Sequence, residues 1–241
     1  MAAQKSVAAP RNGATRLNPK VRKLQILEEA SGFFADHGFQ AGTPDLARRM
    51  GISQPLMYRY FPTKEKLLRD VYRHVFPVNN SWFEWERLLR DTSMPLRLRL
   101  VRFFEEYAEI TWNYRVMRLL LWAGLSRPDL SRHYTAALHG RIFPAIVRAV
   151  RVECGRSAAA PIREDELEIV QALHGTMYHL LGIRRWIHTR RFKGDVRKAI
   201  ALRVDLFLDG AAGMFSSAAV PTRSLGRSVG RNAAKGARLP A

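Results

Sequence analysis

Residues 43–64 encode two short helices separated by a glycine. These helix start and stop signals constrain the fold more than any other feature of the chain. Residues 43–45, Thr-Pro-Asp, have the pattern of a helix start, with a hydroxyl cap, a proline in the first turn and an acid beside it. Gly51 ends that helix, Ser53 caps the next one, and Pro62 follows its end. Two short helices joined by a turn of about three residues have the spacing of a helix-turn-helix.

Helical periodicity continues on both sides of this motif. Asn18 and Pro19 predict a helix start, and Gly38 predicts the end of that helix. Thr63 starts a fourth helix, which ends near Pro77. No segment alternates as a strand does, so we predict an all-α fold. The expected buried positions, spaced by three and four, are Leu24, Leu27, Ala30 and Phe34 in the first helix and Leu67, Leu68, Val71, Tyr72 and Val75 in the fourth.

The order and spacing of these signals are similar to those of a known family. Residues 26–30 (Ile-Leu-Glu-Glu-Ala), 33–39 (Phe-Phe-Ala-Asp-His-Gly-Phe), 46–53 (Leu-Ala-Arg-Arg-Met-Gly-Ile-Ser) and 58–68 (Tyr-Arg-Tyr-Phe-Pro-Thr-Lys-Glu-Lys-Leu-Leu) resemble the amino-terminal domain of TetR-family transcriptional regulators. The resemblance implies a DNA-binding domain over residues 20–75, followed by a larger helical domain for ligand binding and dimerisation.

The third helix of such a domain enters the major groove of DNA. Met57 and Phe61 are four residues apart, so we expect both to pack against the first helix. Gln54 is the best candidate base reader, because a carboxamide can pair with both N6 and N7 of adenine. The other residues left for the outer side are Pro55, Leu56, Arg59 and Tyr60, of which Pro55 and Leu56 suit thymine methyl groups.

The resemblance implies phosphate contacts by Thr43, Tyr58, Tyr60 and Lys64. Hydroxyl groups, an ammonium group and the helix terminus capped by Ser53 all suit phosphate oxygens, and such contacts fix register without reading sequence. Two alternatives stay open: the Tyr58 ring can be ordinary core, and Arg59 can be a solvated surface charge.

Further helices fill residues 76–215. The pattern predicts a short helix around Trp82 and Trp85, and then helices over residues 95–112, 114–125, 128–153, 164–188 and 193–214. We expect a kink at Pro144, a linker over residues 157–161 and a central, buried position for residues 114–125. The total is nine or ten helices.

Two sets of residues in this region are candidates for the ligand and dimer contacts that the resemblance implies. Apolar pockets with few polar groups are typical of ligand sites in helical bundles, although plain core packing explains the same residues. The candidate pocket consists of Phe104, Tyr107, Trp112, Trp122, Phe143, Tyr178 and His179. The candidate dimer interface, on the last two long helices, consists of Leu167, Val170, His174, Met177, Val204, Phe207 and Leu208.

The charge is strongly basic, with 40 Lys+Arg against 21 Asp+Glu and a formal net charge of +19. Residues 1–19 and 216–241 carry cations without acids and are rich in Ala, Gly and Ser, so we predict flexible tails. The cations of these tails are either simply solvated, or they add a sequence-independent attraction to the phosphates of a nucleic acid. One cysteine, Cys154, indicates a reducing compartment. No apolar run reaches the roughly 20 residues of a membrane span, so we expect a cytoplasmic protein associated with the nucleoid and not with membrane.

These features favour a ligand-responsive repressor that binds a pseudo-palindromic site on double-stranded DNA as a homodimer, with a small-molecule effector. The alternative is an architectural DNA-binding protein that recruits a protein partner and senses no small molecule. The sequence has no Gly-rich phosphate loop, nucleophile elbow or metal motif, so we predict no enzymatic activity, no cofactor and no metal site.

Overall fold

The computed structural model describes residues 18–76, 81–188 and 192–216, and within these ranges it is all-helical. Counting helices that continue into one another as one, ten helical rods result, as predicted. The predicted tails fall outside the described residues, apart from their inner ends. The elements are α1 (Pro19–His37), α2 (Thr43–Arg49), α3 (Gln54–Tyr60), α4 (Lys64–Val75), α5 (Ser81–Arg90), α6 (Leu96–Thr111), α7 (Tyr114–Ser126), α8 (Pro128–Ala137), the π-helix η1 (Leu138–Ile142), α9 (Phe143–Glu153), α10 (Glu164–Met177), the π-helix η2 (Tyr178–Ile187) and α11 (Val196–Ser216).

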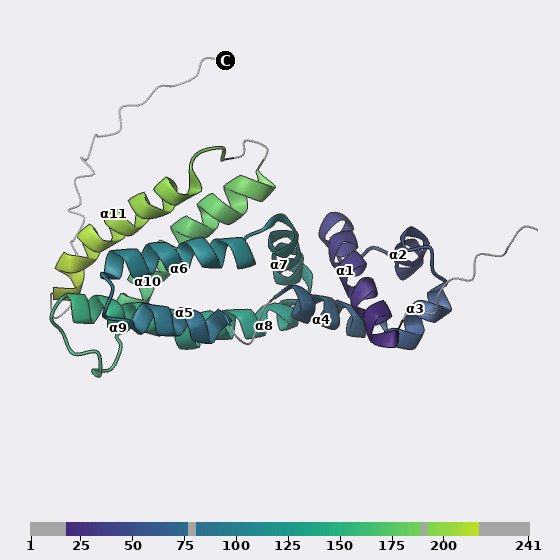
Figure 1. Ribbon diagram of the computed structural model, residues 1–241, viewed down its shortest axis with the longest axis horizontal. Coiled ribbons are helices and arrows are strands. Elements are labelled where there is room, and N and C mark those ends of the chain that lie inside the picture. The colour runs from purple at the N-terminus through teal and green to yellow at the C-terminus, as the bar shows by residue number, and fades with distance from the viewer. Residues whose placement is uncertain (1–17, 77–80, 189–191, 217–241) are drawn as a thin grey trace, which may run out of the picture.

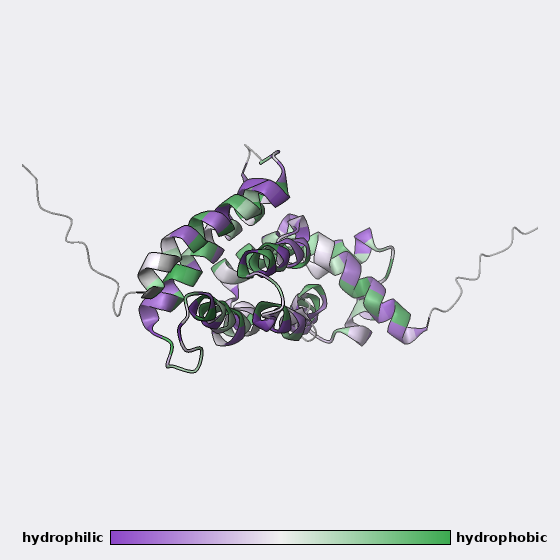
Figure 2. Ribbon diagram, turned by 60° about the vertical axis from the view of Figure 1, so that its left-hand side comes forward, coloured by the Kyte–Doolittle hydropathy of each residue, from purple (hydrophilic) through white to green (hydrophobic). Residues whose placement is uncertain are grey.

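The molecule is elongated, with the helix-turn-helix at one end (Figure 1). Helices α1 to α4 form that end, and α7 lies between α1 and the rest of the body (Figure 1). Hydrophobic and hydrophilic positions alternate along the helices, as expected of amphipathic helices around a core (Figure 2). Among the described residues, no helix combines the length and the hydropathy that a bilayer span requires.

Local side-chain caps set three of the helix starts as predicted. The Asn18 side chain accepts from the Lys20 N–H at 2.9 Å, the Ser53 hydroxyl from the Leu56 N–H at 3.3 Å, and the Thr63 hydroxyl from the Lys66 N–H at 3.1 Å. Our prediction that Thr43 caps α2 is wrong. Gly42 is the N-cap and Thr43 is the first helical residue, because its hydroxyl is taken by a side chain of α3.

Two predictions of burial are also wrong. Leu24 is 55% exposed, because its side chain borders a surface depression shared with Arg49 and Met50. Residues 114–125 are central only in part. Leu119 and Ala123 are fully buried, but Tyr114 and Leu125, at the two ends of α7, are 38% and 81% exposed.

The two longest rods each contain a π-helical segment. Pro144, where we predicted a kink, lies in the first turn of α9 directly after η1. A proline has no N–H to donate, so the preceding turn must pair its carbonyl groups differently. The second π-segment, η2, continues α10. The predicted linker between α9 and α10 is held by the buried Arg151, which binds Glu166 and the carbonyl groups of Ala160 and Pro161.

Gly38, the C-cap of α1, is predicted to be essential for the junction between α1 and α7. Its φ of 79° and ψ of 172° belong to a region that is essentially restricted to glycine, and a Cβ there would lie 3.2 Å from the Trp122 ring. We expect Gly38→Ala to lower the free energy of unfolding by about 2–3 kcal/mol, measured by urea denaturation.

Gly51→Ala is the matched control. Gly51 also has a positive φ, 62°, but nothing lies within 4 Å of an added Cβ. The loss there should be about 1–2 kcal/mol. Equal losses at the two glycines would contradict a close approach of Trp122.

Candidate nucleic-acid interface and ligand groove

Helix α3 buries one side and presents its leading turn to solvent. Met57 and Phe61 are each 1% exposed, which confirms their predicted burial. Pro55 and Arg59 are exposed, while Gln54 and Leu56 are half-buried at the start of the helix. The first turn of α3 therefore has free surface in the part of a helix-turn-helix that faces base edges.

Two of the predicted phosphate-binding hydroxyls lie together. The hydroxyl of Thr43 at the start of α2 and the hydroxyl of Tyr58 on α3 are 3.0 Å apart. Thr43 is 5% exposed and Tyr58 is half-buried, so this hydrogen bond fastens the two helices and leaves part of the Tyr58 edge accessible. The pair fixes the angle between α2 and α3.

The cations of this end differ in whether a carboxylate neutralises them. Arg48 is 2.9 Å from Asp45, and Lys66 is 2.5 Å from Asp70. Arg59 and Lys64 form no ion pair within 4.0 Å in the described part of the chain. Arg59 on α3 and Lys64 at the start of α4 therefore have charges that are available to a phosphate. Tyr60, which lies between them in the sequence, is half-buried.

The helix-turn-helix end is joined to the body mainly through the carboxyl end of α1. The Arg118 guanidinium on α7 donates to the carbonyl groups of Ala35 and Asp36. Trp122, a predicted pocket residue, does not lie with the other pocket candidates. Its ring packs on Gly38 and its indole N–H donates to the Ala35 carbonyl at 3.4 Å.

A groove of about 460 Å³ lies along α7, α8, η1 and α10. Of the predicted pocket residues, Phe143 and Tyr178 line it. The polar and aromatic residues of the wall that the sequence did not single out for a pocket include Tyr134 and His174. The described residues that line it are Leu120, Leu121, Gly124, Leu125, Ser131, Tyr134, Thr135, Leu138, His139, Phe143, Gln171, His174, Gly175 and Tyr178.

An aromatic cluster stands behind the wall of the groove. The Tyr107 hydroxyl is hydrogen-bonded to the Tyr134 hydroxyl and lies 3.2 Å from Nε2 of His174. Trp112 is fully buried, with its ring centre 5.4 Å from that of His174. Tyr107 and Trp112 thus support the groove from behind. Burial raises the pKa values of Tyr107 and Tyr134, so both hydroxyls stay protonated.

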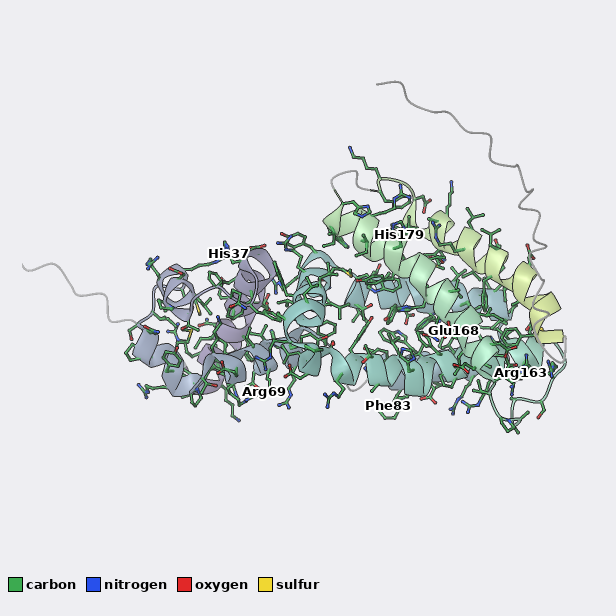
Figure 3. All side chains as sticks on the ribbon, turned by 180° about the vertical axis from the view of Figure 1, so that it is seen from behind. His37, Arg69, Phe83, Arg163, Glu168 and His179 are labelled. Carbon is green, nitrogen blue, oxygen red and sulfur yellow. The ribbon has the colours of Figure 1, made fainter. Side chains whose placement is uncertain are left out.

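The two remaining pocket candidates lie elsewhere. Phe104 is buried beside Phe103 and is not part of the groove lining. His179, labelled in Figure 3, is exposed on η2 with its ring 5.8 Å from that of His188. A signal that could have found the groove residues is the spacing 171, 174, 175 and 178, which places four lining positions on one helix face.

The predicted dimer residues also separate into distinct environments. Val170, Met177 and Val204 have no exposed surface, so they pack within the protomer. Leu167, Phe207 and Leu208 are half-buried on α10 and α11. His174 faces the groove. Among the described side chains of α11, the most exposed apolar ones are two that we did not single out, Leu202 at 58% and Leu206 at 64%.

No group of three or more His, Cys, Asp or Glu side chains within the described ranges is arranged to hold a metal ion. Cys154 is a free thiol at the end of α9, and burial raises its pKa. The structure thus combines a helix-turn-helix that has an accessible leading turn with a helical body that contains a groove. These features define a class of helix-turn-helix proteins in which one chain carries both the DNA-binding domain and the body.

Known proteins place the chain within this class. Residues 26–71 match the family described as "Bacterial regulatory proteins, tetR family". The HTH-type transcriptional activator FasR of Mycolicibacterium smegmatis is 30% identical over 116 residues, which are 47% of this chain and 53% of FasR. The HTH-type transcriptional regulator LuxR of Vibrio harveyi is 40% identical over 62 residues, which are 25% of this chain and 30% of LuxR. The chain thus matches about half or less of the length of these curated relatives.

A solved structure has the same fold over most of the chain. The TetR-family transcriptional regulator PfmR of Thermus thermophilus is 23% identical and has a TM-score of 0.57, with 77% of this chain and 97% of PfmR covered. The helix-turn-helix domain of this protein belongs to the tetR family of bacterial regulatory proteins, and its described helices have the fold of that family.

His174 is predicted to make the fold less stable in mild acid. Burial, together with the charge of His139, lowers the pKa of His174 from 6.5 to about 4. Between these two values the unfolded chain binds a proton that the folded chain does not, so stability falls as the pH falls through this window. The contribution to the free energy of unfolding reaches about 3 kcal/mol at the acid end.

Urea denaturation at pH 7 and near pH 4.5 measures this effect. The loss of stability on acidification should be smaller for His174→Phe than for the unaltered protein. His188→Phe, the same change at an exposed histidine, should leave the loss unchanged. A His174→Phe variant that loses as much as the unaltered protein would show that His174 is not the group responsible.

Proposed function

We propose that the protein regulates transcription by binding a two-fold symmetric site on duplex DNA as a homodimer, in the cytoplasm where the chromosome lies. The observation that carries this proposal is the leading turn of α3, accessible beside two unpaired cations in a domain of the tetR family. A bound dimer covers DNA that polymerase would need, so the expected effect is repression.

An exposed apolar stripe on α11 supports the homodimer part of this proposal. One short helix contacts too few base pairs for specificity in a genome, so two copies are required. Leu202 and Leu206, four residues apart, form an exposed apolar stripe on α11. Half-buried Phe207 and Leu208 flank it. A two-fold axis here would cover these side chains and leave the helix-turn-helix ends free to reach successive major grooves, about 34–36 Å apart.

The groove supports regulation by a small molecule. Tyr134 forms part of its wall, and the ring of Tyr134 is 5.4 Å from the ring of Phe76, which ends α4. Tyr72 stacks on Phe76 at 4.1 Å within the same helix. A ligand that displaces Tyr134 would therefore displace α4. A shift of α4 changes the distance between the two α3 helices of a dimer, so ligand would favour the state with the wrong spacing.

Selection of binding sites from random duplex DNA tests the function directly. The full chain should enrich a pseudo-palindromic motif with half-sites about one helical turn apart. Failure to enrich any motif under low-salt conditions would refute sequence-specific regulation and favour the architectural alternative, in which the protein binds DNA without sequence preference.

Gln54→Ala should weaken binding to the selected motif by about 1–3 kcal/mol and relax the preference at one position in each half-site. Gln54 is the carboxamide on the leading turn of α3, so its loss removes a base contact. Gln25→Ala makes the same change on an exposed position of α1 and should leave the preference intact. Mobility-shift titrations against a panel of single-base variants measure both effects. Equal weakening on every sequence would remove Gln54 from base recognition.

Lys64→Ala should weaken binding to all sequences alike. The Lys64 ammonium forms no ion pair within 4.0 Å in the described part of the chain, so it can displace one counterion from phosphate. The slope of log K against log salt concentration should then fall by about one. Lys193→Ala, an exposed lysine in the body, is the control and should leave the slope unchanged. An unchanged slope for Lys64→Ala would contradict a phosphate contact.

A further inference from the structure

The chemistry of the groove lining points to one class of ligand, an inference that rests on the ligand-responsive function proposed above. Charged residues make up 25% of the chain. None of the fourteen residues that line the groove is Asp, Glu, Lys or Arg. A carboxylate, phosphate or ammonium ligand would meet no carboxylate, lysine or arginine there, so the hydration that it loses on binding would be poorly replaced. The lining therefore selects an uncharged molecule.

The volume and the apolar share of the lining set the size of that molecule. At about 460 Å³ the groove lies within the range of sites for drug-sized ligands. Leucines from α7 and η1 and the ring of Phe143 supply apolar surface, and Gly124 and Gly175 leave room between the facing helices. A flat, fused-ring skeleton suits such a surface, because it gains burial without a large loss of conformational entropy.

Several polar groups of the wall have no hydrogen-bond partner among the described residues, and the half-buried His174 ring carries one of them. Nε2 of His174 is 3.2 Å from the Tyr107 hydroxyl. No described residue forms a hydrogen bond with Nδ1 of the same ring. When the Tyr107 hydroxyl donates to Nε2, the neutral ring carries its proton on Nδ1 and becomes a donor. In that arrangement the Tyr134 hydroxyl is the donor of its hydrogen bond with Tyr107.

The interior behind the groove has a surplus of donors. The Tyr72 hydroxyl and the Trp82 indole N–H are buried without a hydrogen-bond partner in the described part of the chain. Their rings surround Tyr134, since Trp82 lies 6.0 Å from Tyr134 and Tyr72 stacks on the Phe76 ring that contacts it. Unused donors thus lie behind Tyr134, although neither Tyr72 nor Trp82 is among the residues that line the groove.

Both π-helical segments contribute to the wall. Leu138 and His139 belong to η1, and Tyr178 is the first residue of η2. Single π-turns inside longer helices occur frequently at functional sites, because the extra residue turns side chains away from the regular helical register. The two segments of this protein thus turn residues of facing rods toward one groove.

We propose that the groove binds an uncharged, largely apolar fused-ring molecule that carries one acceptor oxygen, and that Nδ1–H of His174 donates a hydrogen bond to that oxygen. His174 is then the residue that determines the preference for an oxygen-bearing ligand over a hydrocarbon of the same shape. The apolar wall supplies the rest of the affinity.

Three probes of nearly identical shape test the class of ligand on the full chain. They are 2-acetylnaphthalene, which carries an acceptor oxygen, 2-ethylnaphthalene, which carries none, and 2-naphthoate, which is charged. In calorimetric titrations the ketone should bind about three- to tenfold more tightly than the hydrocarbon, the ratio expected for one neutral hydrogen bond. The carboxylate should bind at least about 100-fold more weakly than the ketone. Equal binding of carboxylate and ketone, or binding of neither neutral probe, would overturn the proposal.

His174→Phe tests the role of the imidazole, because it keeps an aromatic ring and removes both nitrogen atoms. This variant should bind the ketone and the hydrocarbon equally, while its affinity for the hydrocarbon is preserved. His188→Phe, outside the groove lining, should keep the preference for the ketone. A His174→Phe variant that still prefers the ketone would exclude Nδ1 as the donor. If that variant does not fold, the three probes on the unaltered protein still decide the class of ligand.

The same probes separate this proposal from the proposed function. Binding of the ketone is measured without DNA, so it does not depend on whether the protein is a regulator. If the ketone binds but leaves DNA affinity unchanged, the switch is refuted and the ligand class stands. If DNA binding is specific but the carboxylate is preferred, the ligand class is refuted and regulation stands.

Discussion

The helix-turn-helix end depends on how the carboxyl terminus of α1 is held. The last carbonyl groups of a helix have no partner within it and carry partial negative charge. Here the Arg118 guanidinium binds the carbonyl groups of Ala35 and Asp36, and the ring of Trp122 packs on the glycine that ends the helix. One end of α1 is thereby oriented by α7, a helix of the body. The direction in which α3 faces therefore follows from contacts about 80 residues away in sequence.

A second connection reaches the same end through α4. Glu28 on α1 binds Arg115 of α7 and lies 3.2 Å from His74 of α4. The terminal Phe76 of α4 meets Tyr134 in the wall of the groove. Helix α1 is thus attached to the body by two helices, and both meet the groove. Helix α4 does so through the contact of Phe76 with Tyr134, and α7 through lining residues of its own, Leu120, Leu121, Gly124 and Leu125. A displacement at the groove would therefore reach the helix-turn-helix end through both of these helices.

Local signals made the first four helices predictable, and contacts distant in sequence limited the rest. The caps at Asn18, Ser53 and Thr63 act within three residues, so the sequence contains all that determines them. Thr43 has the same chemistry, but its hydroxyl is taken by Tyr58, fifteen residues away, and the helix starts one residue earlier than a cap would allow. Trp122 was predicted in a pocket for the general reason that it is aromatic, whereas its position is decided by the absence of a side chain at Gly38.

Helix α10 shows why the sequence alone could not distinguish ligand-binding residues from dimer-interface residues. The positions 170, 174 and 177 share a heptad-like stripe, which suggested an interface, whereas the structure divides this stripe between two environments. Val170 and Met177 are fully buried in the protomer, and His174 turns to the groove with Gln171, Gly175 and Tyr178. Residues of the protomer core and residues of the groove occur in the same stripe. Periodicity alone therefore cannot tell which environment a residue at the edge of the stripe belongs to. The helix that carries His174 also packs on α11, where the exposed Leu202 and Leu206 lie. A ligand that moves α10 would therefore change both the groove wall and the surface proposed for dimerisation. Ligand binding and dimer geometry are thus expected to be coupled through this helix.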